Sequence, residues 1–301
     1  MAIYITGSTG FVGQNLLQYF NINNLSPLKI SRKNLLEPEK LSLEKDSTII
    51  HLAGKAHDLR KISDPDEYYK VNFELTKKLY DAFLKSNAKK FIFISSVKAA
   101  ADMVEGILTE EDRPNPQTHY GKSKLMAEQY IQEQPLQAGK SFYILRPCMI
   151  HGPGNKGNLN LLYKFVEKGI PYPLAAFNNK RSFLSVENLC FVIKELFEKQ
   201  IPSGVYNIAD DEALSTNDVV RLLAAAADKK AKLWPIPAGL ISGIARLGNI
   251  FKLPLNTERL TKLTESYVVS NEKIVKAINL PLPVKTKQGL HVTAKSFTNK
   301  K

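Results

Sequence analysis

The stretch AIYITGSTGFVGQNLLQYF, residues 2–20, decides the fold. Residues 3–5 predict a short buried strand, and the apolar side chains of residues 11–20 recur at helical spacing. The turn between them has glycine at positions 7, 10 and 13. A strand, glycine turn and helix in this order let backbone amides and the helix N-terminus approach a pyrophosphate. The glycine spacing differs by one residue from the common dinucleotide fingerprint, so a plain strand-to-helix turn is the alternative.

Strand and helix signals alternate beyond this turn. Strands are predicted at residues 28–30, 48–52, 90–95, 142–145, 183–186 and 205–208, and helices at 68–84, 123–134 and from about Asp218. Strands that alternate with helices form a parallel sheet covered on both faces. We therefore predict an α/β fold, a Rossmann-type doubly wound parallel sheet with a smaller C-terminal substrate lobe.

The composition excludes several classes of protein. Hydrophobic residues make up 44% of the chain and charged residues 24%, as in ordinary globular proteins. Cys148 and Cys190 fit neither a disulfide framework nor a metal site, so we predict no metal. We see neither a signal peptide nor an apolar run of about 20 residues, and we expect a cytoplasmic protein. The net charge of +13 favours anionic partners, but the scattered basic residues do not predict nucleic-acid binding.

The end of the second strand discriminates between NAD and NADP. An acidic residue there would bond the ribose hydroxyls of NAD. The chain instead reads Ser31-Arg32-Lys33, and basic side chains suit the 2′-phosphate of NADP. We predict NADP as the cofactor, with NAD as the alternative.

Tyr120 and Lys124 are the strongest catalytic pair. Their spacing places both on one face of a helix. A nearby ammonium group lowers the pKa of a tyrosine from its usual value near 10, which suits proton transfer to or from a sugar hydroxyl. Ser95 and Ser96 end a predicted strand at the carboxyl edge of the sheet, where open α/β sheets bind ligands. A serine hydroxyl there could bond a substrate oxygen.

Together these motifs resemble the extended short-chain dehydrogenase/reductase family, the nucleotide-sugar epimerase and dehydratase group. His51-Leu52-Ala53-Gly54, Val71-Asn72 and Arg146-Pro147 extend the resemblance in the same order and spacing. It covers nearly the whole chain, and the set of motifs is specific although each member alone is weak.

The resemblance assigns roles residue by residue. It implies that Ser96, Tyr120 and Lys124 are catalytic. Cofactor contacts are implied for Gly7, Thr9, Gly10, Phe11, Val12, Ser31, Arg32, Leu52, Ala53, Gly54, Asn72, Tyr120 and Lys124. Substrate contacts are implied for Lys98, Met149, Asn158, Arg181 and Arg259, with Arg181 on the nucleotide diphosphate. The implied NADP-binding Rossmann domain comprises residues 1–150 and about 183–210, and the nucleotide-sugar lobe about 151–182 and 211–301.

Departures from the family pattern narrow the implied activity. Dehydratases of the group carry an Asp-Glu pair after the catalytic serine or threonine, where this chain has Val97-Lys98. Met149 stands where many epimerases have an asparagine. The short connection at residues 33–38 resembles that of 4-ketosugar reductases. The resemblance thus implies an NAD(P)H-dependent reductase of a nucleotide-linked 4-keto-6-deoxy sugar, of the UDP-N-acetylhexosamine type, in surface polysaccharide biosynthesis.

Two other functions stay open. One is an NAD-dependent UDP-hexose 4-epimerase. The other is a non-catalytic NADP-sensing or RNA-binding protein, against which the presence of Ser96, Tyr120 and Lys124 counts. The resemblance also allows a homodimer that forms through Rossmann-domain helices.

Three further features lie outside these motifs, and two of them have more than one interpretation. His57 would face the nicotinamide or the sugar, or lie on the surface, and His119 is expected in a loop. Residues 237–254 have an amphipathic helical pattern that fits a lid over the sugar pocket, a peripheral membrane contact or an ordinary packed helix.

Overall fold

The computed structural model describes residues 1–55, 64–155, 157–251 and 255–298. His57 therefore lies outside the described residues. The strands are β1 (Ile3–Thr6), β2 (Leu28–Lys29), β3 (Thr48–His51), β4 (Lys90–Ile94), β5 (Ile107–Leu108), β6 (Ser141–Pro147), β7 (Met149–His151), β8 (Phe183–Ser185), β9 (Gly204–Ile208) and β10 (Val268–Val269).

Helices follow most strands. They are α1 (Phe11–Ile22), α2 (Arg32–Leu36), α3 (Pro65–Tyr68), α4 (Leu75–Lys85), α5 (His119–Glu133), α6 (Asn158–Glu167), α7 (Val186–Glu198), α8 (Thr216–Ala226), α9 (Ala238–Ile250), α10 (Thr257–Thr264), α11 (Glu272–Ile278) and α12 (Thr286–Thr298). Three short segments complete the set: the 3₁₀ turns η1 (Pro38–Lys40) and η3 (Val97–Ala99), and the π-helical η2 (Tyr69–Glu74).

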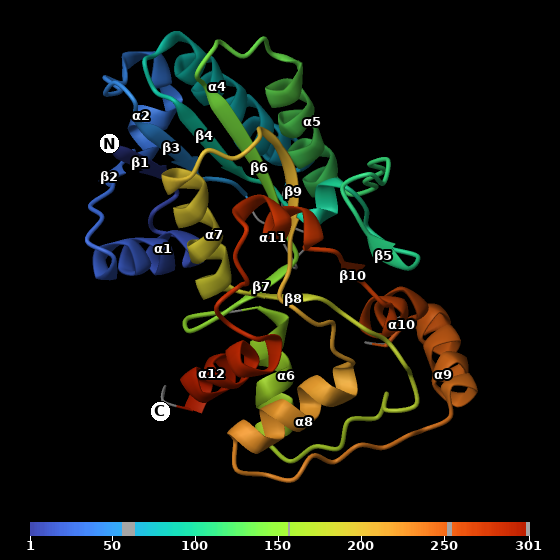
Figure 1. Ribbon diagram of the computed structural model, residues 1–301. Coiled ribbons are helices and arrows are strands. Elements are labelled where there is room, and N and C mark those ends of the chain that lie inside the picture. The colour runs from blue at the N-terminus through green and yellow to red at the C-terminus, as the bar shows by residue number, and fades with distance from the viewer. Residues whose placement is uncertain (56–63, 156, 252–254, 299–301) are drawn as a thin grey trace.

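The central sheet has the strand order β2-β1-β3-β4-β6-β9, and all its neighbouring strands are parallel. Every residue of β1, β3 and β4 is buried, which is why their apolar residues follow one another without alternation. α1 and α7 pack together on one face, and α4 and α5 on the other (Figure 1). The predicted fold class, a doubly wound parallel sheet, is confirmed.

The strand order reverses beside β1, since β2 lies on one side of it and β3 on the other. In open α/β sheets, ligands bind at such a reversal, outside the carboxyl ends of the strands. The glycine turn after β1 and the segments after β3 and β4 therefore meet at this edge.

The C-terminal lobe has a hydrophobic core of its own. α6, α8 and α12 pack on one another around Tyr163, Leu223 and Leu290 (Figure 1). α11 differs from the expected division of the chain, because Ile274 and Ile278 pack into the core of the sheet beside α7 and β9. The rest of the domain division stays a prediction.

Element boundaries differ from the sequence predictions at several places. α5 begins at His119, capped by the Thr118 hydroxyl, so the prediction of His119 in a loop is wrong. The strand predicted to end at 186 stops at Ser185, whose hydroxyl caps α7. The helix predicted at 68–84 is divided by η2. In each case a cap or a local change of helix type, which periodicity does not report, sets the boundary.

Candidate active site

The glycine turn packs directly on the segment that follows β3. Gly7 has a positive φ of 66°, and a Cβ added there would lie 2.6 Å from the Ala53 amide nitrogen. A Cβ on Gly13 would lie 2.3 Å from the Gly7 carbonyl oxygen, which explains the third glycine. Only a backbone without side chains permits this approach. Gly10 is the N-cap of α1 and no side chain among the described residues caps that helix, so its first amides are available to an anion.

The other predicted residues of the turn lie around the N-terminus of α1. Thr9 is exposed, and its carbonyl accepts a hydrogen bond from Gln14 Nε2 at 3.0 Å. Val12 is partly buried against the core of the sheet. Phe11 lies 3.5 Å from where a Cβ of Gly152 would stand, in the loop after β7. Phe11 therefore links the turn to the start of the second lobe.

Asn72 clamps the loop after β3. Its Oδ1 accepts from the Lys55 amide at 2.7 Å, and its Nδ2 donates to the Lys55 carbonyl and to Ser123 Oγ, both at 3.1 Å. A Cβ on Gly54 would lie 3.0 Å from Asn72 Oδ1 and 3.1 Å from Lys124 Nζ. The predicted cofactor segment Leu52–Gly54 is thus held against the predicted catalytic lysine. η2, which carries Asn72, is a π-helical turn of the kind often found at functional sites.

Ser96 and Tyr120 are joined by a hydrogen bond between their side chains. Ser96 follows β4 and caps η3, where its Oγ accepts from the Lys98 amide at 3.2 Å. Tyr120 lies in the first turn of α5 and makes an edge-on contact with Tyr68, with ring centroids 6.2 Å apart. The structure therefore brings together the predicted serine and tyrosine hydroxyls at the carboxyl edge of β4.

Lys124 lies one helical turn after Tyr120 and is buried. Its Nζ donates to the Ile94 carbonyl at 2.9 Å and lies 4.8 Å from the centre of the Phe93 ring. Burial lowers the pKa of Lys124 to about 8, partly opposed by Glu128. The lysine therefore loses its proton at a lower pH than a surface lysine does.

The expected effect of Lys124 on Tyr120 is not found. Burial raises the pKa of Tyr120 above its usual value, and the Ser96 hydrogen bond opposes this only in part. The prediction of a lowered tyrosine pKa is therefore corrected: the loss of hydration on burial is the largest effect on Tyr120, and Lys124 is not among the groups that shift its pKa. Tyr120 is a protonated hydroxyl at neutral pH, which suits a proton donor.

Ser95 has a structural role. Its Oγ donates to Glu128, and the same fully buried carboxylate accepts from Arg146 Nε at 3.1 Å on each oxygen. Glu128 thereby joins α5 to β4 and β6. Its position four residues after Lys124 gives the signal by which the sequence could have identified it, since residues four apart share a helix face.

The N-terminus of α5 is fixed against η3. A Cβ on Gly121 would lie 2.3 Å from the Lys98 carbonyl oxygen. Asp102 Oδ2 accepts from the amides of Gln117 and Thr118 at 2.6 and 3.1 Å. The glycine after the tyrosine therefore allows Tyr120 to approach Ser96 closely.

Ser31 and Arg32 follow β2, which lies on the other side of β1 from β3. Ser31 follows β2, and its Oγ accepts from the Asn34 amide as the cap of α2. Arg32 is the first residue of α2 and is exposed. A basic side chain thus stands where an acid would serve NAD.

Lys98 and Arg181 form a second cationic site beside η3. Lys98 Nζ donates to the Asp102 carbonyl at 2.8 Å and lies 4.3 Å from the centre of the Tyr267 ring. Burial lowers its pKa, opposed by Asp102 and Glu265. Arg181 lies close enough to repel it, and the Arg181 guanidinium is 3.8 Å from Glu265 and donates to its carbonyl at 3.2 Å.

Tyr267 connects this cationic site to the segment that follows η3, since its hydroxyl donates to the Ala101 carbonyl at 2.6 Å. The sequence contains no local signal for Tyr267, which lies 166 residues from its partner. The remaining predicted substrate residues are more dispersed. Met149 is partly buried in β7, Asn158 is exposed at the start of α6, and Arg259 is exposed on α10.

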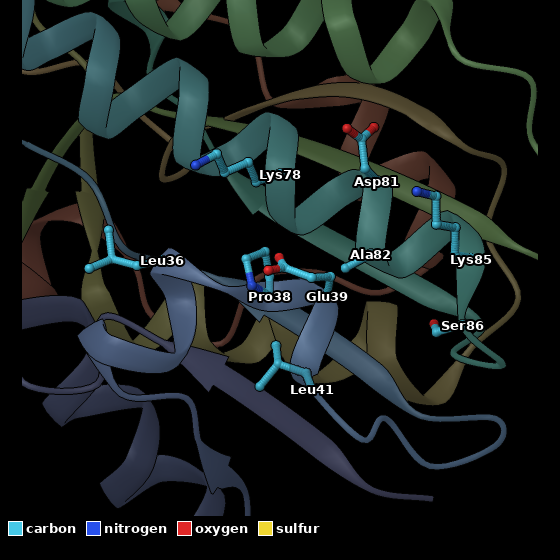
Figure 2. A pocket seen from close by; sticks show the side chains of 9 residues that line it. All are labelled: Leu36, Pro38, Glu39, Leu41, Lys78, Asp81, Ala82, Lys85 and Ser86. Carbon is cyan, nitrogen blue, oxygen red and sulfur yellow. The ribbon is translucent and has the colours of Figure 1, made fainter.

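A surface hollow of about 430 Å³ lies elsewhere, between η1 and α4 (Figure 2). Its described lining, which includes Pro38 and Asp81, contains none of the predicted site residues. Among the described residues no cluster of His, Cys, Asp or Glu could hold a metal ion. None of the described helices has the length and apolar character needed to cross a bilayer.

Comparisons with known proteins agree on one family. A family model described as NAD dependent epimerase/dehydratase family matches residues 3–209. A UDP-glucose 4-epimerase of Vibrio cholerae is 28% identical, over 98% of this chain and 95% of its own. The N-acetyl-alpha-D-glucosaminyl-diphospho-ditrans,octacis-undecaprenol 4-epimerase of Escherichia coli O157:H7 is 30% identical, over 91% of this chain and 84% of its own.

A solved structure, RMD from Pseudomonas aeruginosa complexed with NADPH, superimposes with a TM-score of 0.76 at 21% identity. The match covers 99% of each chain. At this identity the likeness concerns the fold, and it includes the second lobe as well as the sheet.

Proposed function

Since the chain belongs to the NAD dependent epimerase/dehydratase family and is an enzyme of that family, we propose that it is an NADPH-dependent reductase of a nucleotide-linked 4-keto-6-deoxy sugar. The observation that carries this proposal is the pair Ser31-Arg32 at the end of β2, where no acid is present to select NAD. A UDP-N-acetylhexosamine derivative in polysaccharide biosynthesis is the substrate class that the sequence resemblance implies.

The chain's residues fit a dinucleotide. The uncapped N-terminus of α1 and the close approach at Gly7 form a cradle for a pyrophosphate. Arg32 would pair with a 2′-phosphate. Leu52–Gly54, Asn72 and Lys124 would line the part of the site that holds the nicotinamide half of the dinucleotide. A bound NADPH supplies the hydride.

Ser96 and Tyr120 provide the proton chemistry. The Ser96 hydroxyl, already bonded to Tyr120, can donate to the substrate carbonyl oxygen. The Tyr120 hydroxyl gives its proton to that oxygen as the carbonyl becomes an alcohol. Burial raises the pKa of Tyr120, so its hydroxyl holds the proton that the reduction needs.

Arg181 and Lys98 are the proposed substrate anchors. A planar guanidinium suits a diphosphate, and Lys98 stands beside it on η3, one turn from Ser96. This placement would hold the diphosphate at the second lobe while the sugar extends toward Ser96 and Tyr120.

A 4-epimerase is the second candidate. Two relatives that match most of this chain carry that activity in their names. An epimerase keeps its NAD and consumes none, so the two candidates differ in cofactor balance. The non-catalytic alternative is not proposed, because the whole Ser96, Tyr120 and Lys124 set is present.

The deciding experiment follows NADPH absorbance and product structure with UDP-4-keto-6-deoxy-N-acetylglucosamine. We expect one NADPH oxidised for each 4-hydroxy sugar formed. In parallel, UDP-glucose and UDP-N-acetylglucosamine are incubated without added cofactor. Conversion of either to its 4-epimer, with tightly retained NAD and no NADPH use, would reject the reductase.

Arg32 tests the choice of cofactor. A charge-assisted contact to phosphate contributes about 1.5–3 kcal/mol, so Arg32→Ala should weaken NADPH binding roughly ten- to a hundredfold and leave NADH binding unchanged. Lys29→Ala, an exposed basic residue just before the turn, is the matched control. Tighter binding of NADH than NADPH by the wild type would contradict the proposal.

A further inference from the structure

Three successive turns of α5 each bond to the chain at the end of β4. Tyr120, in the first turn, is hydrogen-bonded to the Ser96 side chain. One turn further along, Lys124 Nζ donates to the last carbonyl of β4 at 2.9 Å. One turn beyond that, Glu128 accepts a hydrogen bond from Ser95 Oγ. Because residues four apart share a face of a helix, one face of α5 holds both serines, with the lysine between its two contacts to them.

Glu128 is the point where α5, β4 and β6 meet. The residue is fully buried, and Arg146 on β6 lies against it, with Nε 3.1 Å from each carboxylate oxygen and Nη2 2.5 Å from one of them. The Ser95 amide also donates to the Leu145 carbonyl of β6 at 2.7 Å. Burying two charges costs much of their hydration, and well-packed apolar side chains of the same size are often as stable. Stability alone is therefore a weak explanation for this ion pair.

The carboxylate also acts on Lys124 through its charge. Among the described residues, the ionisable groups around Lys124 are His51 on β3, Tyr120 and Glu128 on α5, and Arg146 on β6. Burial lowers the pKa of His51 to about 3 and raises the pKa of Tyr120, so both are neutral near pH 7. Burial lowers the pKa of Lys124 to about 8, and the Glu128 charge opposes this change. Without Glu128, Lys124 would lose its proton at a still lower pH.

We propose that Glu128 is a positioning residue for Ser96, Tyr120 and Lys124: it holds the end of β4 against α5 through Ser95 and places a carboxylate one helical turn from the lysine. Glu128 is fully buried, so it acts through these neighbours and not on the substrate. The inference rests on the proposed roles of Ser96, Tyr120 and Lys124 in the reaction. Its test therefore includes a measurement that needs no substrate.

The first measurement is an NMR titration of Lys124 in protein that contains lysine labelled at Cε, with Lys124→Arg to identify the signal. Glu128→Gln removes the charge, and Glu128→Leu/Arg146→Met replaces the whole ion pair by apolar side chains of similar size. In both variants we expect Lys124 to lose its proton at a lower pH than in the wild type. The matched control is Glu133→Gln, which removes an exposed carboxylate from the same helix and should titrate as the wild type does.

The second measurement is turnover of the sugar that the protein converts, as a function of pH. In Glu128→Leu/Arg146→Met we expect turnover to fall roughly tenfold or more, because Ser96 and Tyr120 lose their fixed geometry. The loss should be greater at about pH 8.5 than at about pH 6.5, since Lys124 loses its proton earlier. Ser95→Ala breaks only the bond from Glu128 to the end of β4. It should lower turnover roughly three- to tenfold and leave the Lys124 titration unchanged.

Two results would overturn the proposal. One is a Lys124 titration that is the same in both Glu128 variants and the wild type. The other is wild-type turnover and pH profile in folded Glu128→Leu/Arg146→Met, which would make the ion pair purely structural. If that double variant does not fold, wild-type turnover in both Ser95→Ala and Glu128→Gln rejects the proposal instead. A wild type that oxidises no NADPH, but whose Lys124 titration depends on Glu128, would reject the reductase and leave this inference standing.

Discussion

Buried polar groups determine what each residue of the site can do. Ser95 and Ser96 are neighbours in sequence, yet Ser95 is bonded to buried Glu128 while Ser96 is bonded to Tyr120. The alternation of side chains along an extended strand separates them. The sequence resemblance assigned the chemistry to Ser96, and the arrangement of hydroxyls is consistent with that assignment. The resemblance did not reveal that burial raises the pKa of Tyr120 and lowers that of Lys124, because this depends on how deeply the two side chains lie in the fold.

Tyr120 tests the chemistry most directly. Tyr120→Phe removes the proton donor and keeps the ring that packs against Tyr68. We expect turnover to fall by about two to four powers of ten, the usual contribution of general acid–base catalysis. Cofactor affinity, measured by fluorescence titration, should stay within a factor of about two or three of wild type. Turnover within threefold of wild type would remove Tyr120 from the mechanism.

Arg181 tests the substrate anchor. In the structure its guanidinium is held by Glu265 on the second lobe, so two roles compete: a diphosphate contact and a structural ion pair. Arg181→Ala should raise the KM for a UDP-sugar roughly tenfold or more, and Arg181→Lys should restore part of the loss.

The control for Arg181 is Glu265→Gln, which removes the ion pair and keeps the arginine. If Glu265→Gln reproduces the higher KM in full, or if the loss in Arg181→Ala is confined to NADP(H), the diphosphate role is wrong.

At the scale of elements, the sheet was predictable and the long-range contacts were not. Buried apolar runs such as Ile3–Thr6 and Lys90–Ile94 stand out in the sequence because both faces of a parallel sheet are covered. The helix α7 was not predicted, although Leu189, Ile193 and Leu196 recur at helical spacing, because its start was assigned to the end of the strand at 183–186. The contact of Tyr267 with Ala101, just after η3, spans 166 residues, so no local pattern could report it.

The packing of α5 on η3 gives a prediction at this scale. Gly121→Ala places a Cβ 2.3 Å from the Lys98 carbonyl, so the helix must move. We expect a loss of stability of roughly 1–3 kcal/mol. We also expect turnover to fall roughly tenfold or more, because Tyr120 and Ser96 separate. Urea unfolding and steady-state kinetics measure the two effects.

Gly243→Ala is the control, since its added Cβ meets no described atom within 4 Å. In a helix this change should leave stability unchanged or raise it by about 0.5–1 kcal/mol. Equal stability and turnover of Gly121→Ala and wild type would show that the contact between α5 and η3 does not position Tyr120.

At the scale of the whole molecule, one buried histidine on β3 ties the end of β1 to the helix α4 that covers the sheet. His51 Nδ1 is 2.7 Å from Thr6 Oγ1, and Nε2 is 3.0 Å from Thr76 Oγ1 on α4. Thr6 Oγ1 in turn accepts from the Ala53 amide at 3.1 Å. This network of neutral groups holds the carboxyl edge of β1 and β3 in place.

The network makes the fold sensitive to acid. Burial lowers the pKa of His51 from about 6.5 to about 3, with a further contribution from Lys124. Between these values the unfolded chain binds a proton that the folded chain does not. Stability therefore falls as pH drops below about 6.5, and this contribution reaches about 2 kcal/mol between pH 7 and pH 5.

His51→Gln should remove this dependence, because glutamine can bond either threonine and does not titrate. We expect the variant to be less stable than wild type at pH 7, from imperfect packing against Phe93, but to lose about 2 kcal/mol less on going to pH 5. Urea unfolding at both pH values measures the difference. His291→Gln, which alters an exposed histidine on α12, is the matched control and should follow the wild type. If His51→Gln and wild type lose the same stability, His51 is charged in the folded protein, and the neutral network proposed for the edge of β1 and β3 is wrong.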